Sequence, residues 1–184
     1  MKTIICIVGK TGTGKDTIAR YIQEKYGIGM VCSYTTRPKR EIEVDGREHY
    51  FISKIKMAAI CATEHVIAYT INDKTGIEYC ATAESITDKN IVYIINPKGI
   101  EYLKEHLPEG FQLAIMYCNL SETKIKDRVL GRGDNEIIFN TRLLSEREEF
   151  DIFYDNHEYD VVIDTSQSKE EVYKQVDTFL RDIV

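Results

Sequence analysis

A glycine-rich loop near the amino terminus constrains this chain more than any other feature. The loop consists of Gly9, Lys10, Thr11, Gly12, Thr13, Gly14 and Lys15. It follows the apolar run Thr3–Val8 and opens a helical pattern, so a strand, a loop and a helix succeed one another. Glycines let successive backbone N–H groups turn inward around phosphates, and the helix amino terminus adds partial positive charge. The pattern G-x-x-x-x-G-K in this setting predicts a nucleoside triphosphate site, with Lys15 reaching the β- and γ-phosphates.

The position after this lysine departs from the usual pattern. Where Ser or Thr would place a hydroxyl on Mg²⁺, this chain has Asp16, and Thr17 follows it. Because one residue turns about 100° around a helix, Thr17 cannot simply replace the missing hydroxyl. We assign both residues to the ATP-binding segment and expect Asp16 to hold the Mg²⁺ that accompanies ATP, directly or through water. In the alternative arrangement Asp16 turns away to pair with a Lys or Arg, and phosphates and water hold the metal.

Apolar runs and helical patterns alternate along most of the chain. Runs with strand character are Thr3–Val8, Met30–Ser33, Ile91–Ile95, Leu113–Cys118 and Val161–Ile163. Helical patterns cover Lys15–Tyr26, Pro97–His106, Ser121–Leu130, Glu136–Tyr154 and Ser168–Ile183. Most of the strand-like runs are continuous rather than alternating, which is typical of strands buried on both faces of a parallel sheet. The alternation predicts a three-layer α/β fold with helices on both faces of that sheet.

Two stretches interrupt this alternation. Residues 34–88 begin with a charged loop and predict an inserted α+β subdomain between core segments 1–33 and 89–184. Its strand-like runs are Glu48–Ile52, Val66–Ile71 and Ile77–Ala81, and a helix-like run covers Lys54–Ala62. The second stretch, Gly131–Asn135, is short, polar and rich in glycine, and it predicts a mobile lid over about residues 131–141.

Composition limits the remaining possibilities. A length of 184 residues with 43% hydrophobic residues suits a single compact domain. The net charge of −6 argues against a general nucleic-acid-binding protein. The odd number of cysteines without a C-x-x-C pair favours reduced thiols, and the four histidines lack metal-ligand spacing. No run approaches the roughly 18–20 apolar residues of a membrane helix, so we expect a cytoplasmic protein without a membrane partner; its oligomeric state stays open.

An irregular polar pattern follows the phosphate loop. Ser33-Tyr-Thr-Thr-Arg-Pro-Lys-Arg40 is followed by Glu43-Val-Asp-Gly-Arg-Glu-His-Tyr-Phe51. This resembles the guanylate kinase signature, roughly S-x-T-T-R-x-x-R-x-x-E-x-D-G-x-x-Y-x-F, with one extra step before the tyrosine if the spacing is read strictly. The resemblance extends to Gly76–Thr82 (family G-N-Y-Y-G-[ST]-x), Asn96–Gly99 (D-x-x-G), Arg128–Gly133 (R-L-x-x-R-G), Thr141–Leu143 (K-R-L) and the last core strand in Tyr159–Asp164.

The resemblance implies a P-loop nucleoside monophosphate kinase that transfers a phosphoryl group from ATP to GMP or dGMP. Carried over by position, it implies that the acceptor is bound by Ser33, Arg37, Arg40, Tyr50, Tyr79, Thr82 and Asn96. It implies that catalysis depends on Lys15, Arg37, Arg128, Arg132 and Arg142. Guanidinium groups bind phosphate oxygens bidentately, and phosphoryl transfer depends on positioning and charge stabilisation, so no catalytic base is assigned.

Departures from the family pattern leave base recognition open. The family has a glutamate that accepts hydrogen bonds from guanine, whereas Ile67–Thr75 carries a short insertion and no glutamate. The family's Ser/Thr after Y-G falls on Ala81, beside Thr82, and its aspartate falls on Asn96. One alternative is a related kinase acting on another (deoxy)nucleoside monophosphate or a phosphorylated sugar. Another is a non-catalytic guanylate-kinase-like binding module. A GTPase-type switch is disfavoured because no N-K-x-D motif is present.

Overall fold

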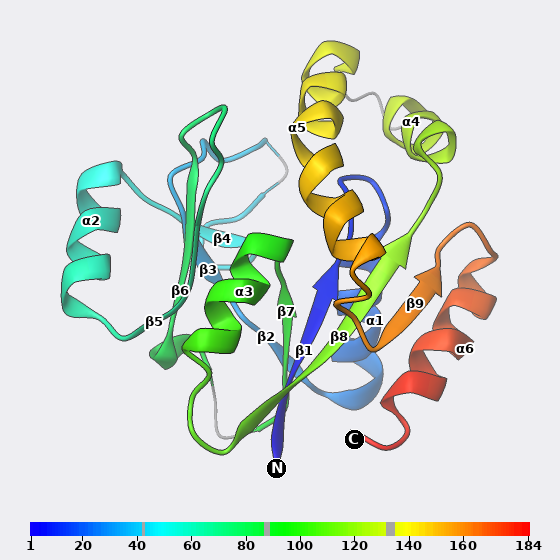
Figure 1. Ribbon diagram of the computed structural model, residues 1–184, viewed down its shortest axis with the longest axis horizontal. Helices are drawn as coiled ribbons and strands as arrows, with labels where there is room; N and C mark the ends of the chain where they lie inside the picture. Colours follow the sequence, from blue (N-terminus) through cyan, green and yellow to red (C-terminus); the bar gives the residue numbers. More distant parts are fainter. Residues whose placement is uncertain (42, 87–88, 132–134) are drawn as a thin grey trace.

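A parallel sheet forms the core of the computed structural model, which describes residues 1–41, 43–86, 89–131 and 135–184 (Figure 1). Within these residues the core sheet has five strands. Their spatial order is β2 (Gly29–Met30), β7 (Ile91–Ile94), β1 (Lys2–Val8), β8 (Phe111–Asn119) and β9 (Val161–Asp164). Every neighbouring pair is parallel, which confirms the predicted sheet. β1 lies in the middle, and ligands of open α/β sheets bind beyond the carboxyl ends of such strands.

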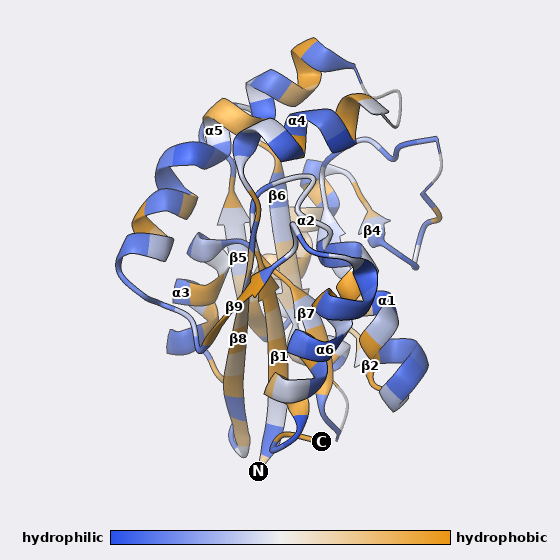
Figure 2. Cartoon of the chain, turned by 90° about the vertical axis from the view of Figure 1, so that its right-hand side faces the viewer, coloured by the Kyte–Doolittle hydropathy of each residue, from blue (hydrophilic) through white to orange (hydrophobic). Residues whose placement is uncertain are grey.

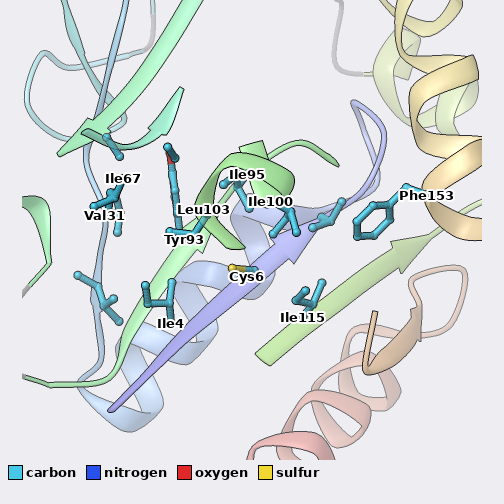
Figure 3. Close-up of a cluster of buried hydrophobic side chains, with 14 of the residues drawn as sticks. Ile4, Cys6, Val31, Ile67, Tyr93, Ile95, Ile100, Leu103, Ile115 and Phe153 are labelled. Carbon is cyan, nitrogen blue, oxygen red and sulfur yellow. The ribbon is translucent and has the colours of Figure 1, made fainter. Parts of the chain in front are cut away.

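Helices cover both faces of the core sheet. On one face Ile5 and Ile7 of β1 pack with α1 (Lys15–Tyr26) and α6 (Lys169–Leu180). On the other, Ile4 and Cys6 pack with α3 (Pro97–Glu105) and α5 (Glu136–Asp155), as Figure 3 shows. Figure 2 shows hydrophobic strands between helices whose outer surfaces are largely hydrophilic. Successive side chains of β1 point to opposite faces of the sheet, and helices cover both faces. This explains the unbroken apolar sequence of β1 and confirms the predicted three-layer fold.

The chain segment that connects β2 to β7 in sequence forms a second, smaller sheet, which Figure 1 shows to the left of the core sheet. In the described residues its strand order is β4 (His49–Phe51), β3 (Ser33–Thr35), β6 (Glu78–Thr82) and β5 (Val66–Ile71). β3 runs parallel to β4 and antiparallel to β6. The helix α2 (Lys54–Thr63) packs on one face of this sheet through Met57 and Ile60, and a short 3₁₀ turn, Ala83–Ser85, follows β6. These elements fall within residues 34–88, apart from the first residue of β3.

The prediction of one strand over Met30–Ser33 is wrong. Met30 pairs with Val92 in the core sheet, whereas Tyr34 pairs with Cys80 in the smaller sheet. The chain changes sheets in between, where the backbone N–H of Val31 still donates to the carbonyl of Val92. A continuous apolar run does not reveal this change, because both halves are extended and partly buried.

The segment predicted as a lid joins α4 (Glu122–Gly131) to α5. Residues 132–134, including Arg132, lie outside the described residues. The side chain of Asn135 accepts hydrogen bonds from the backbone N–H groups of Ile137 and Ile138, which caps α5. Residues 136–141 form the first turns of α5, and the lid over residues 131–141 stays a prediction.

No helix in the described ranges is both long and apolar enough to cross a membrane. The longest helix, α5, carries Glu, Asp and Arg residues along its length. It is held to the core by a few apolar side chains, among them Phe150 and Phe153.

We predict that Phe153→Ala lowers the free energy of unfolding by about 3–5 kcal/mol, because it leaves a cavity in the core. The Phe153 side chain is only 2% exposed, whereas its neighbour Ile152 is 55% exposed on the same helix. Ile152→Ala is therefore the matched control and should cost less than about 1 kcal/mol. Urea unfolding followed by circular dichroism measures both changes, and similar losses for the two variants would contradict the packing of α5.

Candidate active site

The phosphate loop joins β1 to α1 at the carboxyl end of the central strand. Gly12 has φ +80° and Gly14 has φ +95°, a conformation that favours glycine. A Cβ on Gly12 would lie 2.8 Å from Val129 Cγ2, so α4 packs directly against the loop. The Thr13 hydroxyl closes the turn by donating to the Lys10 carbonyl at 2.8 Å. The loop is thus held in shape by its glycines and by α4 before any ligand arrives.

Lys15 extends its side chain back across this loop. Its Nζ donates to the carbonyl oxygens of Gly9 at 2.5 Å and Lys10 at 2.9 Å. Gly14 caps α1, so the amino terminus of the helix also faces the loop. An ammonium group and a helix amino terminus at one loop favour an anion there.

Arg128 reaches the same loop from the end of α4. Its Nη1 lies 3.8 Å from the position that a Cβ on Gly14 would take, and its Nη2 donates to the Thr165 carbonyl. This places one of the predicted catalytic arginines beside the phosphate loop. Arg132, a second one, lies outside the described residues.

Arg40 and Arg142 approach one another from different parts of the fold. Arg40 belongs to the loop after β3 and Arg142 to α5. Burial lowers the pKa of Arg40, and repulsion from Arg142 and then from Arg37 lowers it further. The Arg40 side chain is still 49% exposed, and it lies 3.6 Å from the Glu43 carboxylate. Positive charge thus gathers where the smaller sheet faces α5, and an anion there would relieve the repulsion.

Arg37 has a different environment. Its two terminal nitrogens donate to the two carboxylate oxygens of Glu43 at 2.7 and 2.8 Å, and its guanidinium lies over the Phe51 ring. Burial alone would raise the pKa of Glu43, but hydrogen bonds from Arg37 and the Arg40 backbone lower it to about 2. Arg37 is therefore a buried, paired cation, whereas the Arg40 guanidinium is more exposed. The predicted contact of Arg37 with the acceptor phosphate stays a prediction.

Four further predicted acceptor residues lie on β3, on β6 and directly before α3. Ser33 lies at the start of β3, and Tyr79 lies beside Arg37 on β6. Thr82 is buried at the end of β6. The side chain of Asn96 accepts from the Gly99 backbone N–H at 3.0 Å and so caps α3. The structure gives Asn96 this capping role, and its contact with an acceptor stays a prediction.

Comparison with known proteins identifies the family to which this site belongs. A guanylate kinase family model matches residues 1–183. The chain belongs to the guanylate kinase family. The guanylate kinase of Clostridium acetobutylicum is 28% identical, covering 90% of this chain and 79% of that protein. The guanylate kinase of Prochlorococcus marinus strain NATL2A is 27% identical, covering 95% and 93% respectively.

A solved structure supports the fold assignment. The crystal structure of guanylate kinase from Anaplasma phagocytophilum superposes with a TM-score of 0.68, covering 98% of this chain and 85% of that one at 20% identity. The predicted P-loop kinase fold is therefore confirmed. The guanylate kinase family carries out ATP-dependent phosphoryl transfer.

Tyr50 lies apart from the other predicted acceptor residues of this guanylate kinase family member. Its ring packs against Tyr34 at a centroid distance of 5.2 Å, on the α2 side of the smaller sheet. The neighbouring His49 instead lies on the face that carries Ser33 and Tyr79. The sequence prediction missed His49, although a strict reading of the family spacing places it at the tyrosine position.

The position predicted to hold the metal is exposed. Asp16 lies in the first turn of α1, directly after the loop, and Thr17 is exposed beside it. Across residues 1–41, 43–86, 89–131 and 135–184, no group of three or more His, Cys, Asp or Glu side chains could hold a metal ion. A single carboxylate fits Mg²⁺ that is held mainly by nucleotide phosphates and water. The assignment of Asp16 to the metal stays a proposal.

Carboxylates of α5 contact the phosphate loop, which sequence patterns did not predict. Glu146 Oε2 accepts a hydrogen bond of 2.6 Å from the backbone N–H of Thr11. Asp151 forms an ion pair of 2.7 Å with Lys10, and Glu122 of α4 lies 3.3 Å from the same ammonium. The Thr11 N–H is one of the groups expected to bind phosphate, so Glu146 would compete with the nucleotide for it.

We predict that Glu146→Gln tightens ATP binding by about three- to tenfold, because a neutral amide is a weaker competitor than a carboxylate for this N–H. Glu148→Gln is the matched control, since Glu148 is exposed on the same helix. Calorimetric titration with a non-hydrolysable ATP analogue measures both dissociation constants. Weaker binding by Glu146→Gln would mean that Glu146 assists the nucleotide instead of competing with it.

Proposed function

We propose that this chain transfers the terminal phosphoryl group of ATP to the phosphate of GMP or dGMP, giving ADP and the nucleoside diphosphate. The observation that carries the proposal is the phosphate loop, where the Lys15 ammonium, the glycine turns and the amino terminus of α1 lie together. Arg128 beside the loop and the exposed Arg40 would add positive charge for two phosphate-bearing substrates. The expected cytoplasmic location stays a prediction.

In this reaction an oxygen of the acceptor phosphate attacks the γ-phosphorus of ATP. The bond from that phosphorus to the β–γ bridging oxygen breaks, and ADP leaves. Lys15 and the loop N–H groups would bind the β- and γ-phosphates, and Arg40 would grip the acceptor phosphate. Arg128 and Arg142 would neutralise charge on the transferring group, with Arg132 expected to join them. Catalysis of this kind depends on alignment and electrostatic stabilisation.

A second acceptor remains a candidate because of the residues on β5. Thr70 pairs with Tyr79 and Ala68 with Ala81, so these positions share a face with Tyr79. Val66–Ile71 contains no acidic residue that could accept hydrogen bonds from guanine. This favours testing other (deoxy)nucleoside monophosphates alongside GMP.

The first test measures ADP formation with ATP and a panel of ribo- and deoxynucleoside monophosphates. We expect GMP or dGMP to give the highest kcat/KM. If another monophosphate had a kcat/KM more than about tenfold higher, which corresponds to about 1.4 kcal/mol of transition-state stabilisation, that monophosphate would be the acceptor and the proposed reaction type would stand. Absence of turnover with every acceptor would contradict the proposed function.

Lys15→Ala should lower kcat by about 10²–10³, because a fixed positive charge beside the developing charge is lost. Lys25→Ala is the matched control on the same helix, since Lys25 lies at its far end and pairs with Asp177. Circular dichroism confirms that both variants are folded. Undiminished turnover by folded Lys15→Ala protein would contradict the catalytic role of Lys15.

The proposed metal role of Asp16 predicts a shifted Mg²⁺ requirement. Asp16→Ser should raise the Mg²⁺ concentration that gives half-maximal activity, because one oxygen ligand of the metal or its water shell loses its charge. Glu24→Ser, at an exposed position on the same helix, should leave the titration unchanged. Superimposable curves for wild type and Asp16→Ser would assign the metal to phosphates and water alone.

A further inference from the structure

The register of β3 and β4 decides which side chain of β4 faces the predicted acceptor residues. Ser33 is opposite His49, Tyr34 is opposite Tyr50, and Thr35 is opposite Phe51. Partners in register point to the same face of a sheet, and successive residues alternate. His49 therefore shares a face with Ser33, whereas Tyr50 shares the opposite face with Tyr34.

The contacts of Tyr50 agree with this division. Its ring lies 5.2 Å from that of Tyr34, which packs against the cluster of Met57, Ile60 and Cys80 beneath α2. Gly46 also lies against the Tyr50 ring, where a Cβ would be 3.3 Å from Cε1. Tyr50 is thus an aromatic contact on the α2 side of the sheet.

The contacts of His49 place it beside the predicted acceptor residues Ser33 and Tyr79. His49 Nδ1 lies 2.9 Å from the Ser33 hydroxyl, and its ring is 5.7 Å from that of Tyr79 in an edge arrangement. Phe51 flanks the ring at 5.9 Å. Among the described residues, the other ring nitrogen, Nε2, makes no hydrogen bond. One side of the imidazole is therefore fixed, and the other remains able to bind a ligand.

Burial, together with the charge of Arg37, keeps the His49 ring neutral at pH 7 by lowering its pKa. Burial and then the positive charge of Arg37 lower its pKa to about 4, Arg40 acts in the same sense, and Glu43 opposes them. A neutral ring that accepts the Ser33 hydroxyl proton at Nδ1 carries its own proton on Nε2. That N–H is suited to donate to a phosphate oxygen. An arriving phosphate dianion would also offset the field of the arginines and raise the pKa of the ring.

We propose that His49, and not Tyr50, binds the phosphate of the monophosphate acceptor in this chain, through its Nε2. This inference rests on the proposed function, because it assigns a further residue to the acceptor site. Ser33 positions the ring, and Arg40 supplies the charge beside it. A strict reading of the family spacing gives the same position, since His49 stands where the guanylate kinase pattern has its tyrosine.

The kinetic test compares His49→Phe, His49→Tyr and Tyr50→Phe. His49→Phe should raise KM for GMP by about 10- to 100-fold, the effect of losing a hydrogen bond to a charged group, and leave KM for ATP within about twofold. His49→Tyr should restore most of the GMP affinity, because its hydroxyl can donate again. His65→Phe, at an exposed position, controls for the general effect of a His→Phe change.

The Tyr50→Phe variant tests the alternative, in which Tyr50 binds the acceptor phosphate. If Tyr50 bound the phosphate, this variant would raise KM for GMP and His49→Phe would not. Equal increases in KM for GMP and ATP in His49→Phe would show that the ring only supports the structure, and would overturn the proposal.

A binding measurement keeps the proposal testable if His49→Phe does not fold. The imidazole ¹⁵N resonances of wild-type protein at pH 7 should move at His49 on addition of GMP, and much less with guanosine. The spectrum of His49→Tyr assigns the signal. Unmoved His49 resonances at saturating GMP would overturn the proposal. If no monophosphate is phosphorylated, the proposed function fails, yet the same comparison of GMP with guanosine still decides whether His49 meets a phosphate.

Discussion

The burial of β1 on both faces and along both edges fixes the position of the phosphate loop. Val8 pairs with Tyr117 of β8, and Ile7 pairs with Ile94 of β7. The chain leaves this strand at Gly9, where a Cβ would lie 2.7 Å from the Cys118 carbonyl oxygen. The loop therefore starts in contact with the neighbouring strand. Its geometry depends on core packing, which is rigid, rather than on surface contacts, which are not.

The sequence predicted the bounds of a helix or strand correctly where residues next to the element determine where it begins and ends. The predicted bounds of α1, Lys15–Tyr26, agree with the structure because glycines flank the helix on both sides. β5 agrees over Val66–Ile71, where an apolar run ends at a polar turn. The prediction of one strand over Met30–Ser33 was wrong because the pairing partners change within the run. The backbone N–H of Val31 still donates to Val92 of the core sheet, while Ser33 already pairs with His49 of the smaller sheet. Pairing between strands distant in sequence leaves no local signal.

The candidate site shows the same limit. Pattern matching located the loop around Lys15 and the segment that carries Arg40, because each pattern is continuous in sequence. It did not separate His49 from Tyr50, since a shift of one residue in a strand moves a side chain to the opposite face. It also missed Glu146, whose contact with Thr11 spans 135 positions and depends on how α5 packs against the loop. Such contacts follow from tertiary packing and not from spacing.

The distribution of charge distinguishes fixed from exchangeable partners in the site. The pair of Arg37 and Glu43 is buried at 6% and 8% side-chain exposure, and separating such a pair leaves a costly unpaired charge. We therefore expect Arg37 to keep its pairing with Glu43 when substrates bind. The Asp151 carboxylate on Lys10 is 52% exposed, so a phosphate can displace it at little cost. The charge of Arg142 lowers the pKa of Arg40, so an anion between them would be stabilised. In the proposed reaction, substrate phosphates would replace the exposed carboxylate at the loop and reduce the repulsion between the arginines, which would reconcile two anionic substrates with a net charge of −6.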